Sequence, residues 1–130
     1  MPAPSPEACR MRVLVVEDDD DTLVMTLELL ESLGHWATGV KSAEGALNRF
    51  LEGAFDVLVA DVGLPALSGC ELAEMLQARC RVPVIFATGR EPPAQAMQGT
   101  IWLQKPYSVA QMKQALSEAA RLAGQAGPTT

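Results

Sequence analysis

Four short apolar runs are spread along the chain, at residues 11–16, 57–60, 82–87 and 100–103. Each is rich in valine, leucine, isoleucine or other apolar residues and too short for a typical helix, which is characteristic of strands buried on both faces of a sheet. Residues 35–40 form a fifth, more polar candidate between the first two runs. The pattern therefore predicts five short strands.

Helical spacing of apolar residues fills most of the stretches between these strands. The first such stretch predicts a helix over residues 22–33, with Asp20 or Asp21 as its N-cap and Gly34 at its end. Three more helices are predicted to begin at residues that can cap a helix, namely Ser42, Ser68 paired with Glu71, and Ser108 paired with Gln111.

The alternation of strands and helices predicts an α/β fold with a doubly wound, five-stranded parallel sheet covered by helices on both faces. Residues 89–99 are the exception, because Pro92, Pro93 and two glycines disfavour a full helix there. We therefore expect the fourth helix to be shortened or replaced by a loop. The domain is expected to span residues 11–122, with a disordered arm at residues 1–10 and a flexible tail at residues 123–130.

The composition narrows the class of protein. The 130 residues suffice for one domain, and three cysteines with a single histidine exclude a Cys/His zinc site and disfavour a disulfide framework. The net charge of −6 comes largely from five consecutive acids at residues 17–21. The chain has no basic run and its pI is about 4.7, which argues against a nucleic-acid surface. No apolar run is long enough to span a membrane, so a cytoplasmic protein is expected.

Polar side chains follow four of the predicted strands. Glu17 and Asp18 follow the first, Asp61 follows the run at 57–60, and the last two runs lead to Thr88 and Lys105. Because ligands of open parallel sheets bind at the carboxyl ends of the strands, we expect these groups to meet. Close carboxylates need compensating cations, and a lysine with Mg²⁺ would supply them. Such a carboxylate can attack phosphorus and form an acyl phosphate.

Four segments carry a resemblance to response-regulator receiver domains, which are phosphoacceptor modules of two-component signalling. They are VLVVEDD at residues 13–19, DVGLPALSG at 61–69, IFATG at 85–89 and KPY at 105–107. These segments are similar to the acidic pair, the phosphoacceptor loop, the switch-threonine strand and the Lys-Pro-aromatic ending of that family. The resemblance covers residues 11–122 and implies a flavodoxin-like (βα)5 fold.

The resemblance assigns roles to individual residues. It implies that Asp61 accepts a phosphoryl group from the phosphohistidine of a histidine kinase or a histidine phosphotransfer protein. Lys105 would pair first with the acidic cluster and then with the phosphate. Thr88 would respond to the phosphate by moving toward it, and Trp102 would be the switch aromatic, although a plain core aromatic is the alternative for Trp102.

The same resemblance implies a Mg²⁺ site. Asp18, the Asp61 side chain and the Gly63 backbone carbonyl would hold the ion, and Glu17 would help through a bound water. The chain would then be a switch with self-catalysed phosphorylation and dephosphorylation rather than an enzyme, with no output domain and no membrane segment. It resembles both free-standing regulators and receivers of hybrid kinases, and a homodimer is a further partner that the family allows.

Two features depart from the family. The distance from Thr88 to Lys105 is 17 residues, shorter than in most receivers, and the missing length falls in residues 89–99. The run FATG at residues 86–89 resembles a subgroup with a Phe-Ala-Thr-Gly-Tyr motif, but Arg90 stands where that subgroup has tyrosine. Arg90 and Gly63 occupy positions that tune the lifetime of the phosphate in the family.

Two other functions remain open. Residues 18–22 also fit the D-x-D-x-T pattern of haloacid-dehalogenase-type phosphatases, with Asp18 as the nucleophile of a Mg²⁺-dependent hydrolase. That reading leaves Asp61 and the Lys105 segment unexplained. A receiver-like module that binds proteins without being phosphorylated is the second alternative.

Overall fold

A five-stranded parallel sheet forms the centre of the structure, a computed structural model that describes residues 10–52, 55–63, 69–78, 82–95 and 98–126. The strands run in the order β2-β1-β3-β4-β5. Their bounds are Arg12–Val16 (β1), Trp36–Val40 (β2), Val57–Ala60 (β3), Val84–Thr88 (β4) and Thr100–Gln104 (β5). Both the five strands and the flavodoxin-like topology agree with the sequence prediction.

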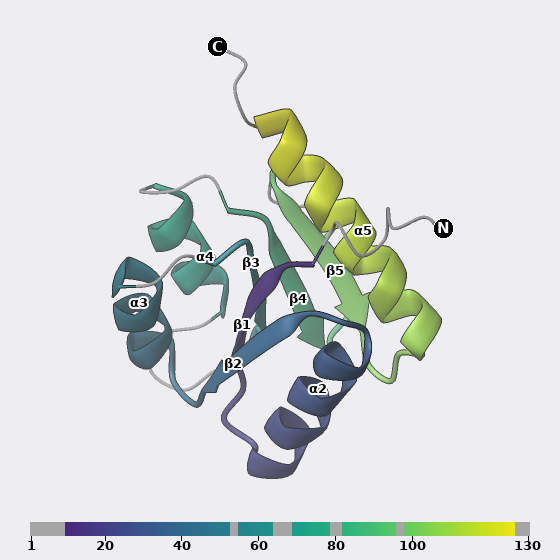
Figure 1. Ribbon diagram of the computed structural model, residues 1–130. Coiled ribbons are helices and arrows are strands. Elements are labelled where there is room, and N and C mark those ends of the chain that lie inside the picture. Colours follow the sequence, from purple (N-terminus) through teal and green to yellow (C-terminus); the bar gives the residue numbers. More distant parts are fainter. Residues whose placement is uncertain (1–9, 53–54, 64–68, 79–81, 96–97, 127–130) are drawn as a thin grey trace.

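Helices cover both faces of this sheet, as Figure 1 shows. Helices α2 (Asp20–Ser32) and α5 (Val109–Ala126) lie on one face, and α3 (Ala43–Glu52) and α4 (Gly69–Gln77) lie on the other. Residues of β1 alternate between two apolar clusters, because successive side chains of a strand point to opposite faces. Val13 and Val15 pack toward α2 and α5, whereas Leu14 and Val16 pack toward α3 and α4.

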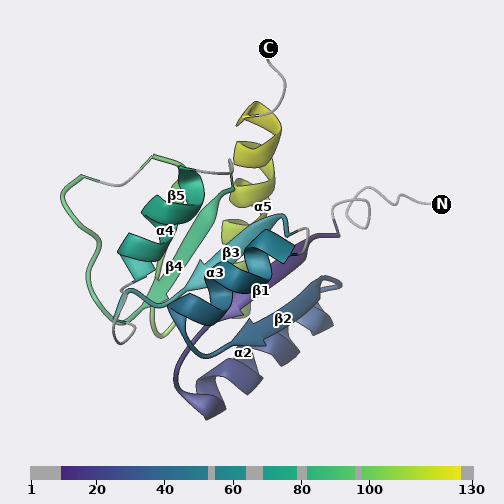
Figure 2. The ribbon, with the colours of Figure 1, turned by 90° about the vertical axis from the view of Figure 1, so that its left-hand side faces the viewer.

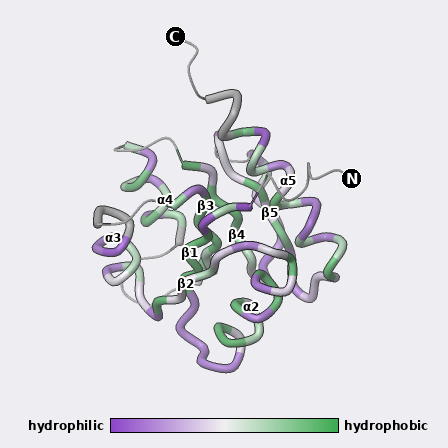
Figure 3. The backbone as a smooth tube through the Cα atoms, viewed as in Figure 1, coloured by the Kyte–Doolittle hydropathy of each residue, from purple (hydrophilic) through white to green (hydrophobic). Residues whose placement is uncertain are grey.

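The hydrophobic residues of the central strands form the middle of the core. Figure 3 shows them in green along β1, β3 and β4, whereas the segment that leads from β1 into α2 is hydrophilic. Every residue of β3 and β4 is buried. Polar groups are therefore confined to the ends of these strands, where a site can form.

The connection between β4 and β5 contains no helix in its described residues, 89–95 and 98–99. This agrees with the expected loss of the fourth helix and is visible in Figure 2. The indole N–H of Trp102 donates to the carbonyl of Arg90 over 3.0 Å, and the Gln77 side chain donates to the carbonyl of Gln98 over 3.3 Å. Side chains of β5 and α4 thus hold the described residues of this connection.

The predicted N-cap of the first helix is wrong. The N-cap of α2 is Asp19, not Asp20 or Asp21, because its carboxylate accepts hydrogen bonds from the backbone N–H and the hydroxyl of Thr22. The run of five acids offered several equivalent caps. Helix α5 runs from Val109 to Ala126, since alanines favour the helix despite one glycine.

Other predicted helix signals stand as expected. Gly34 follows α2 with a φ of 96°, a left-handed conformation that glycine adopts without strain. The hydroxyl of Ser42 accepts from the Gly45 N–H at the start of α3. Ser68, residues 1–9 and residues 127–130 lie outside the described residues, so the division into arm, domain and tail stays a prediction. None of the described helices is long and apolar enough to cross a membrane.

The capping box of α5 generates a stability prediction. The Ser108 hydroxyl accepts from the Gln111 N–H over 3.1 Å, and the Gln111 side chain accepts from the Ser108 N–H over 2.8 Å. Replacing Ser108 with alanine should lower the free energy of unfolding by about 1 kcal/mol, measured by urea denaturation. Gln114→Ala on the same exposed surface of α5 is the control, and an equal loss in both variants would contradict the assignment of the cap.

Candidate functional site

Three charged side chains predicted to meet do so at the carboxyl ends of the strands. Glu17 directly follows β1, Asp61 directly follows β3, and Lys105 directly follows β5. The Lys105 Nζ lies 3.2 Å from the Glu17 Oε1 and 3.5 Å from the Asp61 Oδ2. The two carboxylates follow the neighbouring strands β1 and β3, and the ammonium group reaches them from β5, on the other side of β4.

Backbone hydrogen bonds between neighbouring strands fix the starting points of these side chains. The N–H of Glu17 donates to the last carbonyl of β2 over 3.1 Å, and the N–H of Asp61 donates to the last carbonyl of β1 over 3.4 Å. The N–H of Lys105 donates to the carbonyl of Thr88 over 2.8 Å. The sheet ladder thus extends one residue into each loop, so the site rests on the rigid part of the fold.

The charge balance of the site rests on Lys105. Burial by itself lowers the pKa of this lysine, but the hydrogen bond and the attraction of Glu17 outweigh it, and Asp61 adds to them. The net effect is a raised pKa, so Lys105 is a cation throughout the neutral range. The Glu17 side chain is only 8% exposed. A carboxylate this buried needs a cation nearby, and Lys105 is that cation.

Asp61 is held at both oxygens. Its Oδ2 faces Lys105, and its Oδ1 accepts from the Gly63 N–H over 3.0 Å. The side chain nevertheless remains 22% exposed, so a reactant can approach it. A Cβ atom at Gly63 would lie 3.4 Å from an Arg90 guanidinium nitrogen and 3.9 Å from the Asp61 Oδ1. The Arg90 side chain therefore lies directly over Gly63, next to the predicted phosphoacceptor.

Thr88, at the end of β4, is 2% exposed. Its hydroxyl accepts from the Arg90 N–H over 3.3 Å, and the Arg90 carbonyl in turn accepts from the Trp102 indole. The Trp102 ring also packs against Phe86, with 5.7 Å between the ring centroids. The two residues predicted to form the switch are thus connected through the backbone of Arg90. The sequence motifs identified Thr88, Arg90 and Trp102 as residues of interest. They did not reveal that hydrogen bonds connect the three.

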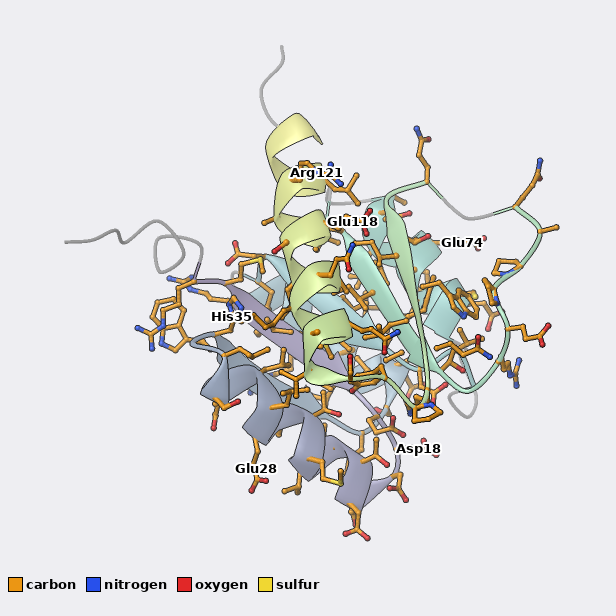
Figure 4. All side chains as sticks on the ribbon, turned by 90° about the vertical axis from the view of Figure 1, so that its right-hand side faces the viewer. Asp18, Glu28, His35, Glu74, Glu118 and Arg121 are labelled. Atoms are coloured by element: carbon orange, nitrogen blue, oxygen red, sulfur yellow. The ribbon has the colours of Figure 1, made fainter. Side chains whose placement is uncertain are left out.

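The remaining acids of the run at 17–21 have different partners. Asp18 is exposed, and Figure 4 shows it at the end of the molecule where α2 begins. The Thr22 side chain and N–H, which hydrogen-bond to Asp19, lower the pKa of that carboxyl. Asp20 forms an exposed ion pair with Lys41. Sequence reasoning missed the structural role of Asp19, because nothing in a run of aspartates distinguishes the capping one.

The predicted metal ligands are hard oxygen donors, which suits Mg²⁺. Glu17 and Asp61 lie around one cation, and Asp18 follows Glu17 in the chain. Among the described residues, however, no three acidic, histidine or cysteine side chains are already arranged around a common point for a metal. The chemistry of the donors fits a magnesium ion, but Lys105 neutralises two of the carboxylates in this arrangement.

A comparison with protein families decides the identity of the fold. The model of the response regulator receiver domain matches residues 13–117, which is most of the chain. The chain belongs to the response regulator receiver domain family. The four segments that carry the sequence resemblance lie inside the matched range.

Two curated relatives place this receiver domain among signalling proteins. The virulence sensor protein BvgS of Bordetella pertussis is 33% identical over 129 residues, which cover 89% of this chain and 10% of the sensor. The sensory transduction protein RegX3 of Mycobacterium tuberculosis is 32% identical over 105 residues, covering 77% of this chain and 46% of that protein. The receiver domain therefore spans less than half the length of either relative.

Solved structures share the fold of this receiver domain. A response regulator receiver domain protein from Clostridium thermocellum aligns with a TM-score of 0.78 at 25% identity, over 88% of this chain and 98% of that one. A CheY-like receiver domain from Methylobacillus flagellatus aligns with a TM-score of 0.77 at 27% identity, over 85% and 98% of the two chains.

The bridging lysine generates a prediction about stability. Lys105→Met removes the cation beside the buried Glu17, so the free energy of unfolding at neutral pH should fall by about 1–2 kcal/mol. Adding Asp61→Asn to that variant should recover part of the loss, because it removes one of the two carboxylates left without a counter-charge. Urea denaturation measures both effects. Lys41→Met, which breaks an exposed pair, should leave the free energy of unfolding nearly unchanged.

The pH dependence of that difference follows from the raised pKa of Lys105. The stabilising contribution is fully present below the ordinary lysine pKa of 10.5 and is lost as the pH rises through the higher folded-state value. The stability difference between the receiver domain and Lys105→Met should therefore be constant from neutral pH to about pH 10 and shrink above it. A difference that vanishes below pH 9 would contradict this account.

Proposed function

We propose that this chain is the phosphoryl-accepting receiver of a two-component or phosphorelay system, with Asp61 as the phosphoacceptor. The observation that carries the proposal is the Asp61 carboxylate, partly exposed and held between the Gly63 N–H and the Lys105 ammonium. The donor would be a phosphohistidine on a histidine kinase or a histidine phosphotransfer protein. Membership of the receiver family supports this choice of partner.

The transfer step follows from the position of Asp61. One Asp61 oxygen attacks the phosphorus, a new O–P bond forms, and the N–P bond of the phosphohistidine breaks. The electron pair of the broken bond returns to the imidazole nitrogen, which takes up a proton. Lys105 already faces the Oδ2, so it can move its charge onto the phosphoryl oxygens with a small shift of its side chain.

Magnesium would add charge compensation for the phosphoryl group when bound. Asp18, Asp61 and the Gly63 carbonyl are the proposed ligands, with Glu17 acting through a water. In the present arrangement Lys105 is the cation that contacts both Glu17 and Asp61. When the ion binds, these two carboxylates would turn part of their contact from Lys105 to the ion. Arg90 supplies a further positive charge over Gly63 and is placed to face the phosphoryl group on Asp61.

The switch that we propose starts at Thr88. In the present arrangement its hydroxyl accepts from the Arg90 N–H. A phosphoryl group on Asp61 would draw the hydroxyl away as a donor, which frees the Arg90 backbone and with it the carbonyl that binds the Trp102 indole. The chain would thus act as a switch with self-catalysed phosphorylation and dephosphorylation.

The partner surface is proposed to include α2. Val24 and Met25 on this helix are 53% and 68% exposed, and the helix begins two residues after Asp18. Exposed apolar side chains near the start of α2 suit the docking of a protein that brings a phosphohistidine to Asp61.

We propose that the contact between this chain and its phosphoryl donor forms in the cytoplasm.

One observation speaks against the phosphatase alternative. In the D-x-D-x-T pattern the second acid would be Asp20, which pairs with Lys41, and the threonine would be Thr22, which bonds the capping Asp19. Both are engaged at the start of α2 rather than with Asp18. The binding module that is never phosphorylated is tested by the experiment below.

Phosphorylation at Asp61 predicts a mass change. Incubation with acetyl phosphate and Mg²⁺ should add one phosphoryl group, detected by intact-mass spectrometry and abolished by a chelator. Asp61→Asn should lose the adduct, whereas Asp21→Asn in the exposed acidic run should keep it. An unmodified parent chain would favour the binding module, and phosphate release that depends on Asp18 but not on Asp61 would favour the hydrolase.

Movement of Trp102 predicts a fluorescence change. The chain has two tryptophans, so Trp36→Phe leaves Trp102 as the single reporter. Acetyl phosphate with Mg²⁺ should change its emission, because its hydrogen bond to Arg90 is altered. Asp61→Asn should abolish the change, and Thr88→Ala should reduce it without preventing phosphorylation. Complete phosphorylation with unaltered emission would make Trp102 an ordinary core aromatic.

A further inference from the structure

A cavity of about 300 Å³ opens at the end of the molecule opposite the phosphoacceptor. Its walls come from the residue before β1, the turn between α2 and β2, and the helix α5. Figure 4 shows His35, which lines it, at the other end of α2 from Asp18. The volume is at the lower end of the range of small-molecule sites, roughly 300–1,000 Å³. The cavity shares no residue with the site proposed for phosphorylation.

The greater part of the lining is apolar. Four side chains supply it, namely Met11, Leu33, Leu116 and Ala120. Met11 and Leu116 are buried, at 8% and 2% exposure, so the cavity reaches the edge of the core. The apolar wall calls for a ligand with an apolar body.

The polar part of the lining consists of hydrogen-bond donors from His35, Lys113 and Ser117. The Nδ1 of His35 accepts from the Met11 N–H over 3.1 Å, so the neutral ring carries its proton on Nε2. Burial, and then the charge of Arg10, lower the pKa of His35 and keep the ring neutral at pH 7. Within the described residues the Nε2 has no hydrogen-bond partner.

Lys113 differs from the other two lysines of the chain in having no ion pair among the described residues. Lys41 pairs with Asp20, and Lys105 pairs with Glu17 and Asp61. No acidic residue lines the cavity. Arg10 stacks over the Trp36 ring at 4.2 Å and adds positive charge on the same side of His35. Lys113 therefore lines the cavity as a cation, and Arg10 adds positive charge near His35.

We propose that this cavity binds a small organic carboxylate, with its apolar body against Met11 and Leu116 and its carboxylate at Lys113 and His35. A protonated amine would be repelled by the ammonium group of Lys113, and an uncharged alcohol would leave that group without a counter-charge. The ligand is therefore distinguished by its negative charge as well as by its apolar body.

Octanoate is the probe that tests this proposal. Titrated into the full chain carrying ¹³C-methyl methionine, it should shift the Met11 methyl signal in a saturable way, whereas octan-1-ol and octylammonium should bind at least about fivefold more weakly. Lys113→Gln should weaken octanoate binding about fivefold. Arg121→Gln removes the same charge from the same helix, where it pairs with Glu118 at 3.5 Å, and should leave binding unchanged.

A second variant tests whether octanoate binds inside the cavity rather than only being attracted to the charge of Lys113. Ala120→Phe should fill the cavity and abolish the Met11 shift, provided that circular dichroism shows a folded chain. Asp61→Asn should bind octanoate normally, so this result is independent of phosphorylation. The proposal is overturned if octanoate leaves the Met11 methyl signal unshifted, if octan-1-ol or octylammonium binds as well as octanoate, or if Lys113→Gln and Arg121→Gln behave alike.

Discussion

The ion bridge between Lys105, Glu17 and Asp61 is the interaction on which the site depends. It joins residues that follow three different strands, and it neutralises a carboxylate that is almost completely buried. Two carboxylates at the end of a hydrophobic sheet would otherwise repel each other and favour opening of the loops. The same bridge leaves Asp61 partly exposed, with a cation at one oxygen and a backbone N–H at the other. The arrangement that pairs these charges therefore also leaves Asp61 accessible for the phosphoryl transfer that we propose.

The sheet explains why so few residues can build this arrangement. Its strands are parallel and buried, so their polar side chains gather where the ladder ends. Backbone hydrogen bonds continue one residue beyond the strands and hold Glu17, Asp61 and Lys105 at fixed starting points. On the β4 side the lost helix is replaced by a segment tied through Arg90 to both Thr88 and Trp102. The described residues of this connection contain no helix, and these two hydrogen bonds join Arg90 to the end of β4 and to β5.

Much of the fold could be predicted from the sequence, because a short apolar run such as residues 57–60 is typical of a buried strand and Gly34 stands where a helix is expected to end. The meeting of Glu17, Asp61 and Lys105 followed from the parallel topology. The cap at Asp19 could not be predicted, since one aspartate among five carries no distinguishing pattern. The link from Thr88 through Arg90 to Trp102 and the cavity beside His35 were also out of reach. Both depend on the path of irregular backbone and on side-chain orientation, which periodicity does not encode.

The central claim is that the Asp61 carboxylate forms the bond to phosphorus, and locating that bond tests it most directly. After incubation with acetyl phosphate and Mg²⁺, borohydride reduces an aspartyl phosphate to homoserine, which peptide mass spectrometry assigns to a position. The account predicts homoserine at residue 61 and at no other aspartate of the chain. Homoserine at Asp18, or at another aspartate of residues 18–21, in place of residue 61 would contradict it.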